Sequence, residues 1–346
     1  MATGELTIDL TALAANWRAL DATGGAETGA VVKADGYGLG AARVARTLAA
    51  AGARTFFVAD ASEGAAVRAA VGDRPRIFVF GGHQRGDTPD IAAHRLIPLL
   101  NSPEQWGLHR AALPAAPFGV QLDTGMSRLG LQPADWRALR AEIEAARPTL
   151  VISHLACADE PGHPQNAAQL DAFRRMTEGT GAPRSLAATG GTLLGPDYHF
   201  DLVRPGIGLY GGQPFADARP VVGLSLPVIQ IRDVPEGATA GYGAAWTARR
   251  PSRLATLSGG YADGLIRALS AGCDLWAGAV RCALAGRVSM DLLIVDVTDA
   301  PDLPESLDIL GTRQGIDDLA AAAGTIGYEV LTSLGSRYRR REGPLD

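Results

Sequence analysis

The stretch "AVVKADGYGLG", residues 30–40, places Lys33 at the end of an apolar run and directly before a glycine-rich turn that carries Tyr37. Residues at the carboxyl ends of barrel strands face the active site, and apolar neighbours there lower the pKa of a lysine amine. Such an amine suits a Schiff base. Lys33 is the only lysine of the chain, and every other Lys or Arg position is arginine. Because the sequence otherwise uses arginine, a single lysine at a strand end is more consistent with a chemical role than with a surface role.

Polar residues also follow later apolar runs, and two of those turns are rich in glycine. The turns are "ATGGTL" and "RPGIGLYGG". Exposed backbone N–H groups in such turns suit a phosphate, which barrels commonly bind at their last strands. An early lysine with two late glycine-rich turns therefore predicts a site for a phosphate-bearing ligand. The polar residues at strand ends are Asp123, Thr124, Arg128, His154, Thr189 and Arg204.

Two other ligand classes fit the sequence less well. His154, Cys157, Asp159 and His163 cluster, but their spacing matches neither CxxC nor HxxxH zinc patterns. We therefore expect no metal, and we interpret His154 as a hydrogen-bonding residue at the barrel mouth. The turn "GYGLG" does not complete the GxGxxG fingerprint, which argues against NAD.

Composition limits the class of protein. The 346 residues carry a net charge of −5 without a long basic stripe, which argues against nucleic acid as a partner. Three cysteines without CxxC spacing favour a reducing compartment. The first residues show no signal-peptide pattern, and no apolar run approaches the roughly 18 residues that span a bilayer. We expect a cytoplasmic protein with no membrane partner.

The elements that must position these residues form a repeating pattern before residue 210. Short apolar runs alternate with helical stretches such as "GAARVARTLAAAGA". The pattern predicts parallel strands joined by crossover helices, in an (α/β)8 TIM-type barrel; an open doubly wound sheet shares it. Consecutive apolar residues indicate strands buried on both faces. The runs are "AVVKA", "TFFVAD", "RIFVFGG", "RLIPLL", "FGVQLD", "LVISHL", "SLAAT" and "DLVRPG".

Beyond Gly212 the pattern becomes strand-like, with Gly and Pro between the strands and little helical spacing until about Ile316. We predict a barrel domain at residues 1–221 and a C-terminal mainly-β domain at residues 222–346. The first strand, near Leu6–Leu10, is able to join the β domain. The C-terminal "SRYRRREGPLD" is expected to be a solvated tail.

The sequence resembles the alanine racemase family of fold-type III enzymes, which depend on pyridoxal 5'-phosphate (PLP). The match runs in order from "TIDLTALAANWRAL" to the C-terminal arginines. The matching segments are "AVVKADGYGLG", "LDTGMSRLG", "SHLACADE", "RPGIGLYGG", "AGYGAAW", "GGYADGLIR", "GRVSMD" and "GYEVLTSLGSRYRR". The resemblance implies a barrel followed by a β domain, in a head-to-tail homodimer.

The resemblance also implies roles for individual residues. Lys33 would hold PLP and handle the D-side proton, while Tyr242 of the other subunit would handle the L-side proton. PLP acts as the electron sink. Because a free tyrosine has a pKa of about 10, Tyr242 needs support, which the family pattern places at His154 and Arg204.

Further positions follow from the same resemblance. Arg204 would also face the pyridine nitrogen and keep it unprotonated, because arginine does not give up its proton. Phosphate contacts map to Tyr37, Thr189, Gly206 and Ile207, and substrate contacts to Arg128 and the Met290 backbone. Tyr261, Arg267 and Asp291 map to the surroundings of the site and its access path.

The sequence departs from the family pattern at several places. Gln121 stands where many relatives carry a carbamylated lysine; its amide can accept a hydrogen bond from Arg128 but cannot pair with its charge. Ser185 and Ala188 replace a histidine and an asparagine of relatives, and Ser336 falls where some relatives have a tyrosine that touches the phosphate. These changes bear on substrate strictness more than on the type of reaction.

The favoured function is alanine racemisation that supplies D-alanine for peptidoglycan. A racemase of serine or of broader amino-acid specificity remains open. A fold-type III decarboxylase of basic amino acids fits less well, because its C-terminal Cys- and Glu-rich motif is missing. A single-barrel PLP-binding protein lacks the residues that follow the barrel here.

Overall fold

The chain, described here by a computed structural model over residues 3–302 and 305–345, forms two compact units. The barrel unit comprises Leu13–Leu209 and Pro214–Asp217. The β unit comprises the other described residues, up to Ala12, Tyr210–Gln213 and from Ala218 onward. The domain boundary between residues 221 and 222 stays a prediction.

Parallel strands form the centre of the barrel unit. Seven of them pair in sequence order, from β3 to β9, and β10 pairs with β2. Only Gly29 separates β2 from β3. The strands are β2 (Glu27–Thr28), β3 (Ala30–Val31), β4 (Thr55–Val58), β5 (Arg76–Val79), β6 (Ile97–Leu100), β7 (Gly119–Gln121), β8 (Val151–Ile152), β9 (Arg184–Ser185) and β10 (Leu202–Val203).

Backbone hydrogen bonds close this sheet on itself. Arg204 N donates to Ala187 O at 2.8 Å, which joins the ends of β10 and β9. Val31 N donates to Pro205 O at 3.0 Å, which joins the first strand to the last. With β2 and β3 counted as one strand, the result is the predicted eight-stranded barrel, and the predicted fold class is confirmed. Strands β4 and β6 are buried along their whole length, as the continuous apolar runs require.

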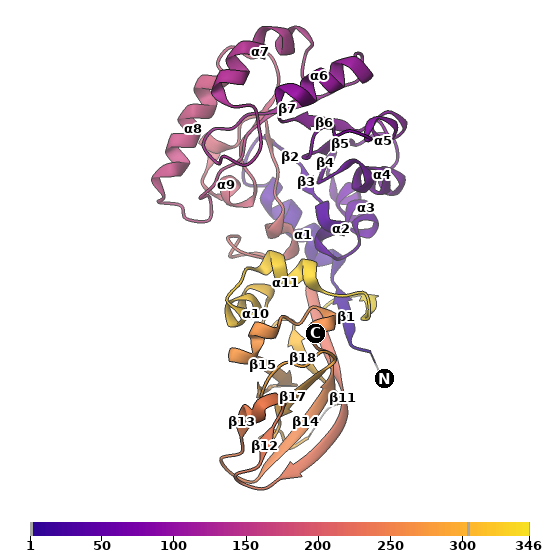
Figure 1. Ribbon diagram of the computed structural model, residues 1–346, viewed down its shortest axis with the longest axis vertical. Helices are drawn as coiled ribbons and strands as arrows, with labels where there is room; N and C mark the ends of the chain where they lie inside the picture. The colour runs from indigo at the N-terminus through magenta and orange to yellow at the C-terminus, as the bar shows by residue number, and fades with distance from the viewer. Residues whose placement is uncertain (1–2, 303–304, 346) are drawn as a thin grey trace. The chain divides into compact units, whose positions relative to one another are not determined.

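Helices surround the barrel strands, with α3 to α8 on the outside (Figure 1). Their starts carry sequence signals: Asp60 and Ser102 cap α4 and α6 with their side chains. The helices are α1 (Leu10–Asp21), α2 (Lys33–Tyr37), α3 (Ala41–Ala51), α4 (Ala61–Val71), α5 (Thr88–Ala93), α6 (Pro103–Ala112), α7 (Pro133–Ala145), α8 (Pro164–Met176) and α9 (Thr189–Leu193), with short 3-10 turns η1 (Pro196–Tyr198) and η2 (Ile207–Tyr210).

The β unit is built on one eight-stranded sheet in the order β14-β17-β16-β15-β18-β11-β1-β19. Its strands are β1 (Glu5–Ile8), β11 (Val222–Val234), β14 (Ser252–Ser258), β15 (Asp274–Ala277), β16 (Val280–Leu284), β17 (Leu292–Asp296), β18 (Ser306–Leu310) and β19 (Arg339–Glu342). A hairpin of β12 (Thr239–Ala240) and β13 (Trp246–Thr247), the helices α10 (Ile316–Ala323) and α11 (Gly327–Ser333), and the turns η3 (Tyr242–Ala244), η4 (Tyr261–Asp263) and η5 (Arg267–Ala271) complete it.

The C-terminal arginines are not the solvated tail that we predicted. Residues Arg339–Glu342 form β19, which pairs in parallel with β1. Glu5 on β1 forms ion pairs with Arg339 and Arg341 on β19, and the hydrogen bond from Arg339 lowers the pKa of Glu5. Charged side chains on an edge strand resemble a solvated tail in the sequence. The pairing depends on a strand at the other end of the chain.

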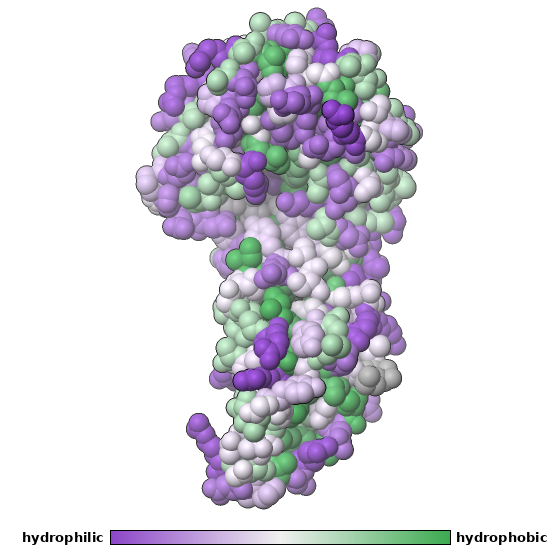
Figure 2. All heavy atoms as spheres, viewed as in Figure 1, coloured by the Kyte–Doolittle hydropathy of each residue, from purple (hydrophilic) through white to green (hydrophobic). Residues whose placement is uncertain are grey.

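No helix within residues 3–302 and 305–345 is long and apolar enough to cross a membrane. On the face shown in Figure 2, hydrophilic side chains cover most of the barrel unit.

Candidate active site

Lys33 stands where β3 ends, and an unusual backbone turn follows it. Ala34, Asp35, Gly36 and Tyr37 all have positive φ, between 51° and 64°. Only glycine adopts this left-handed region without strain, and each other residue in it costs on the order of 1 kcal/mol. Strain of this kind persists only where surrounding contacts hold it, and it often marks functional segments.

Two carboxylates hold the turn. Asp35 Oδ1 accepts a hydrogen bond from Ala41 N at 2.7 Å, at the start of α3. Glu63 Oε1 accepts from Ala34 N at 2.7 Å, and its Oε2 accepts from Ala59 N at 2.8 Å. Glu63 therefore ties the residue after Lys33 to the end of β4. Neither carboxylate was predicted from the sequence, because no sequence motif indicates a contact between Glu63 and a residue 29 positions away.

The surroundings of Lys33 favour the neutral amine. Burial lowers its pKa, the guanidinium of Arg128 lowers it further, and Glu63 opposes the shift. The amine nitrogen lies 5.8 Å from the centre of the Phe80 ring. The lowered pKa that we predicted from the apolar run is thus present in the fold, and it makes the amine a better nucleophile.

Arg204 is a buried cation, and no carboxylate within residues 3–302 and 305–345 forms an ion pair with it. Its side chain is 1% exposed. Nη1 donates to Ser185 Oγ at 2.5 Å, and Nη2 donates to Ser153 O at 2.6 Å. Burial lowers the pKa of Arg204 to about 9, so the group stays charged at neutral pH. A positive charge fixed here by neutral acceptors is available to a ligand with a complementary acceptor.

His154 follows β8 in the same electrostatic neighbourhood. Burial lowers its pKa to about 3, and the charges of Arg204, Arg128 and Lys33 act in the same direction. The imidazole is therefore neutral at pH 7. The charges of Lys33, Arg128 and Arg204 thus all act on His154, so the barrel unit holds these four groups within electrostatic reach of one another.

A small cradle lies at the ends of β9 and β10. Thr189 Oγ1 accepts hydrogen bonds from Gly206 N at 3.0 Å and Gly208 N at 3.2 Å. A Cβ on Gly206 would lie 2.3 Å from the Tyr37 hydroxyl, so the tyrosine packs directly against this backbone. Ile207 begins η2 beside it. Two hydroxyls and a glycine backbone in this arrangement suit the oxygens of a phosphate.

Arg128 lies on an exposed loop that Asp123 organises. Asp123 Oδ1 accepts from the backbone N–H groups of Gly125, Met126 and Ser127 at 2.9, 3.0 and 3.1 Å. Gln121 is buried, and its amide donates to Leu129 O at 3.3 Å rather than accepting from Arg128. The Gln121 side chain therefore supports the loop by a hydrogen bond to the backbone of Leu129.

The remaining predicted site residues belong to the β unit; they are Tyr242, Tyr261, Arg267, Met290 and Asp291. Tyr242 is 70% exposed, Met290 54% and Tyr261 42%. These three side chains therefore lie on the surface of the β unit.

Within the β unit, one arginine that the sequence analysis did not single out fixes two of these loops. Arg337 binds Asp263 with Nε and Nη2, at 2.5 and 2.7 Å, and Asp291 with Nη1 at 2.8 Å. Tyr261 N donates to Ser289 O at 3.0 Å, which joins the same two loops. The backbone of the loops that carry Tyr261 and Met290 is therefore held in place, although both side chains are exposed.

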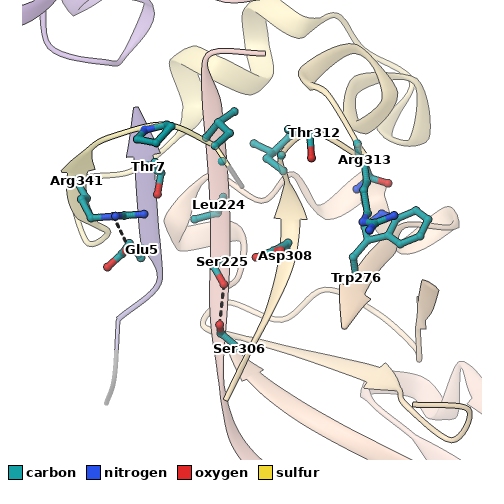
Figure 3. A pocket seen from close by; sticks show the side chains of 16 residues that line it. Glu5, Thr7, Leu224, Ser225, Trp276, Ser306, Asp308, Thr312, Arg313 and Arg341 are labelled. Atoms are coloured by element: carbon teal, nitrogen blue, oxygen red, sulfur yellow. Dashed lines mark hydrogen bonds and ion pairs between the residues drawn. The ribbon is translucent and has the colours of Figure 1, made fainter. Parts of the chain in front are cut away.

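The β unit also has a hollow of about 300 Å³ on its sheet (Figure 3). Glu5 and Arg341 are paired with each other at its wall, at 3.0 Å, and the Arg313 guanidinium lies 5.6 Å from the Trp276 ring centre. None of the predicted site residues lines it.

Comparison with known proteins agrees with this geometry. Residues 8–214 match the family model of the alanine racemase N-terminal domain, and residues 221–342 that of the C-terminal domain. The chain is 66% identical to an alanine racemase of Jannaschia sp. (strain CCS1), over 99% of this chain and all of that protein. The chain is also 46% identical to an alanine racemase of Rhizobium meliloti (strain 1021). That match covers 98% of this chain and 96% of that protein.

Solved structures give the same result. The alanine racemase of Bartonella henselae, which carries covalently bound pyridoxal phosphate, is 37% identical with a TM-score of 0.93, over 99% of this chain and all of that one. Two domain matches and a 66% identical relative of full length leave no ambiguity about the family. The chain belongs to the alanine racemase family.

Proposed function

We propose that this protein is a PLP-dependent alanine racemase that interconverts L-alanine and D-alanine. In this proposal residues 1–221 hold the cofactor and residues 222–346 supply Tyr242. The proposal rests on three features of the barrel unit. The Lys33 amine has a lowered pKa, Arg204 is buried with no carboxylate of the described residues as its partner, and the Thr189 hydroxyl accepts a hydrogen bond from the backbone of Gly206.

The residues present fit PLP. The Lys33 amine would hold the cofactor covalently. Tyr37, Thr189 and the backbone of Gly206 and Ile207 would bind its phosphate, and the close approach of Tyr37 to Gly206 supports this. When bound, PLP supplies an electron sink for the negative charge that develops at the substrate Cα.

Arg204 would face the pyridine nitrogen. Since its pKa is lowered only to about 9, it remains a donor at neutral pH and leaves that nitrogen unprotonated. An unprotonated ring nitrogen would draw less negative charge from the substrate Cα, which would favour return of the proton over transamination.

Racemisation requires proton transfer on both faces of Cα, and we assign one face to each of two bases. Lys33 takes or returns the proton on the D-side, and Tyr242 of a second subunit acts on the L-side. The 70% exposure of Tyr242 supports this assignment, because a side chain with few contacts in its own unit is available to a partner. The active form is accordingly a homodimer with a shared site.

Tyr242 acts as a base only if its pKa lies below the usual value of about 10. The ring N–H of a neutral His154 would donate a hydrogen bond to the phenolate oxygen, which stabilises the ionised form and lowers the pKa of Tyr242. The strongly lowered pKa of His154 supports a neutral imidazole in this position.

Arg128 and the backbone N–H of Met290 would bind the substrate carboxylate. With Gln121 supporting the Arg128 loop only through Leu129 O, the guanidinium is free to accommodate other small amino acids. Serine, or a broader set of amino acids, is therefore the second candidate substrate. In the cell we expect the enzyme to act in the cytoplasm and to supply D-alanine for peptidoglycan.

The decisive experiment incubates the purified protein with L-alanine and PLP and measures the chirality of the recovered alanine. Drift to an equal mixture of enantiomers is expected. Alanine that stays L, with the protein still showing the absorption band of a lysine-bound cofactor, would overturn alanine as the substrate. L-serine, assayed in parallel, then tests the second candidate.

A further inference from the structure

A buried amide outside the predicted set contacts the backbone on both sides of the segment that carries His154. Gln169, on α8, is 0% exposed. Its Oε1 accepts from Ala156 N at 2.8 Å, and its Nε2 donates to His154 O at 2.9 Å. Each buried amide group that loses its partner costs roughly 1–3 kcal/mol, so these bonds fix the segment firmly.

The imidazole of His154 depends on that backbone for its position. In the described part of the chain, its ring makes no hydrogen bond to another residue. A side chain that is not itself tethered takes its position from its Cα and from packing. Movement of residues 154–156 would therefore move the ring directly.

The same amide connects to the arginine of the site. Nε2 of Gln169 also donates to Thr124 Oγ1 at 3.3 Å, and this hydroxyl bonds to Ser153 Oγ at 2.8 Å. Arg204 Nη2 donates to Ser153 O at 2.6 Å. One hydrogen-bonded network thus links α8, the ends of β7 and β8, and Arg204.

We propose that Gln169 is a positioning residue that places His154 for the proton transfer of Tyr242. The proposal rests on the proposed function, because it assigns Tyr242 to the L-side proton and His154 to its support. Lys33 lies at the end of β3, outside this network. Loss of Gln169 should therefore slow one of the two proton transfers and leave the other.

This asymmetry gives a kinetic signature. The two enantiomers have equal energy, so kcat/KM must remain equal in both directions. When Tyr242 acts more slowly, removal of the Cα proton from L-alanine becomes more rate-limiting, and the Cα-deuterium isotope effect for L→D rises. In the D→L direction, removal of the Cα proton from D-alanine by Lys33 becomes less rate-limiting. The Cα-deuterium isotope effect for D→L therefore falls. Loss of folded protein moves neither value.

The test compares Gln169→Met, which keeps the length of the side chain without its hydrogen bonds, with Asn166→Leu on the same helix. Asn166 is 2% exposed and donates to Cys157 O and Glu160 O, at 3.1 and 3.0 Å, in the loop that follows. It is a matched buried amide that does not contact His154. Displacements of about 1 Å can cost up to about 100-fold in rate.

We expect kcat/KM of Gln169→Met holoenzyme to fall about 10-fold or more, with isotope effects that diverge between the two directions. Asn166→Leu should keep the wild-type isotope effects whatever its melting temperature. Isotope effects in Gln169→Met that equal those of the wild type, or that rise together in both directions, would overturn the proposal.

A second readout does not depend on PLP or on turnover. Histidine-selective 15N NMR at pH 7.5, on protein without added PLP, is expected to show the His154 ring signals displaced in Gln169→Met and unchanged in Asn166→Leu. A His154→Asn variant assigns the signals. Unchanged signals in Gln169→Met would contradict the proposal even if wild-type protein fails to racemise alanine, which separates it from failure of the proposed function.

If Gln169→Met does not fold, Gln169→Glu replaces it in both measurements. The carboxylate still accepts from Ala156 N, but it cannot donate to His154 O. The same divergence of isotope effects and the same displacement of ring signals are expected. Wild-type values for both would overturn the proposal.

Discussion

The two units hold their proposed site residues in opposite ways. In the barrel unit Arg204 and Thr189 are enclosed, at 1% and 2% exposed, and each is hydrogen-bonded inside the protein, although Arg128 lies on an exposed loop. In the β unit Tyr242 and Met290 are 70% and 54% exposed. The barrel unit thus holds these two groups in fixed positions, whereas the β unit leaves Tyr242 and Met290 exposed on its surface.

The difference extends to the backbone. The barrel unit holds a left-handed turn at Ala34–Tyr37 by means of Asp35 and Glu63. The β unit fixes its loops with the ion pairs of Arg337. The backbone strain next to Lys33 is consistent with a segment that holds a cofactor. The ion-paired loops under the exposed side chains of the β unit are consistent with a surface that binds a partner.

Lys33→Ala should have the largest effect, because it removes the only lysine amine. Racemisation should fall by at least about 10³-fold, and the visible absorption band of the cofactor should be lost. The melting temperature without PLP should change little, since Lys33 is only half-buried. An unchanged absorption spectrum would place the cofactor elsewhere.

Tyr242→Phe tests the exposed half of the site. We expect kcat for L-alanine to fall about 10²- to 10⁴-fold while PLP stays bound. Because the side chain is 70% exposed in its own unit, circular dichroism should show the wild-type melting temperature. Full activity in this variant would eliminate the two-base assignment.

Gly206→Ala tests the enclosed cradle. The added Cβ would lie 2.3 Å from the Tyr37 hydroxyl, so the tyrosine must move. Overpacking of this kind costs about 1–3 kcal/mol, and we expect PLP affinity, measured by fluorescence titration, to drop about 10-fold or more. An added Cβ would also have free space at Gly272, but the φ of 148° there would strain an alanine, so Gly272→Ala is not a suitable control. Gly107→Ala, where no atom lies within 4 Å, should bind PLP like the wild type.

Stability should decline on acidification because of the barrel unit. Burial lowers the pKa of His154 to about 3 from an ordinary 6.5, so the unfolded chain binds a proton in this window that the folded chain does not. The free energy of unfolding therefore falls as pH drops below about 6.5, by up to about 1.4 kcal/mol per unit for such a group. Burial lowers the pKa values of His83 and His109 in the same direction.

Differential scanning calorimetry at pH 7.5, 6.5 and 5.5 measures this decline. His154→Gln, which cannot titrate, should show a shallower dependence than the wild type. A melting temperature that rises as the pH falls would contradict the assignment.

Arg337→Lys should give the smallest effect. It keeps the charge but loses the two-pronged contact with Asp263, while backbone bonds still join the two loops. We expect a modest rise in KM for alanine at nearly constant kcat. Arg339→Lys, on an ion pair with Glu5 at the sheet edge, is the control and should leave both constants unchanged. Equal effects of the two variants would mean that Arg337 acts only on stability.

Much of the molecule was readable from the sequence. Each of the eight apolar runs became a barrel strand, because a buried parallel strand requires continuous apolar residues. Lys33 stood out through its position and its uniqueness, and the motif order indicated the family. Local composition and spacing determine these features, so they need no knowledge of distant contacts.

Tertiary structure alone decided the rest. The pairing of β19 with β1 joins residues more than 300 positions apart. Glu63 binds the backbone of another β–α repeat at Ala34, and Gln169 binds backbone atoms 13 and 15 positions before it. Arg337 reaches loops 46 and 74 positions away. A polar side chain in a helix or a tail looks solvent-exposed in the sequence. Only the closed fold shows which of these side chains satisfy buried groups, because hydrogen bonds and ion pairs depend on distances that folding sets.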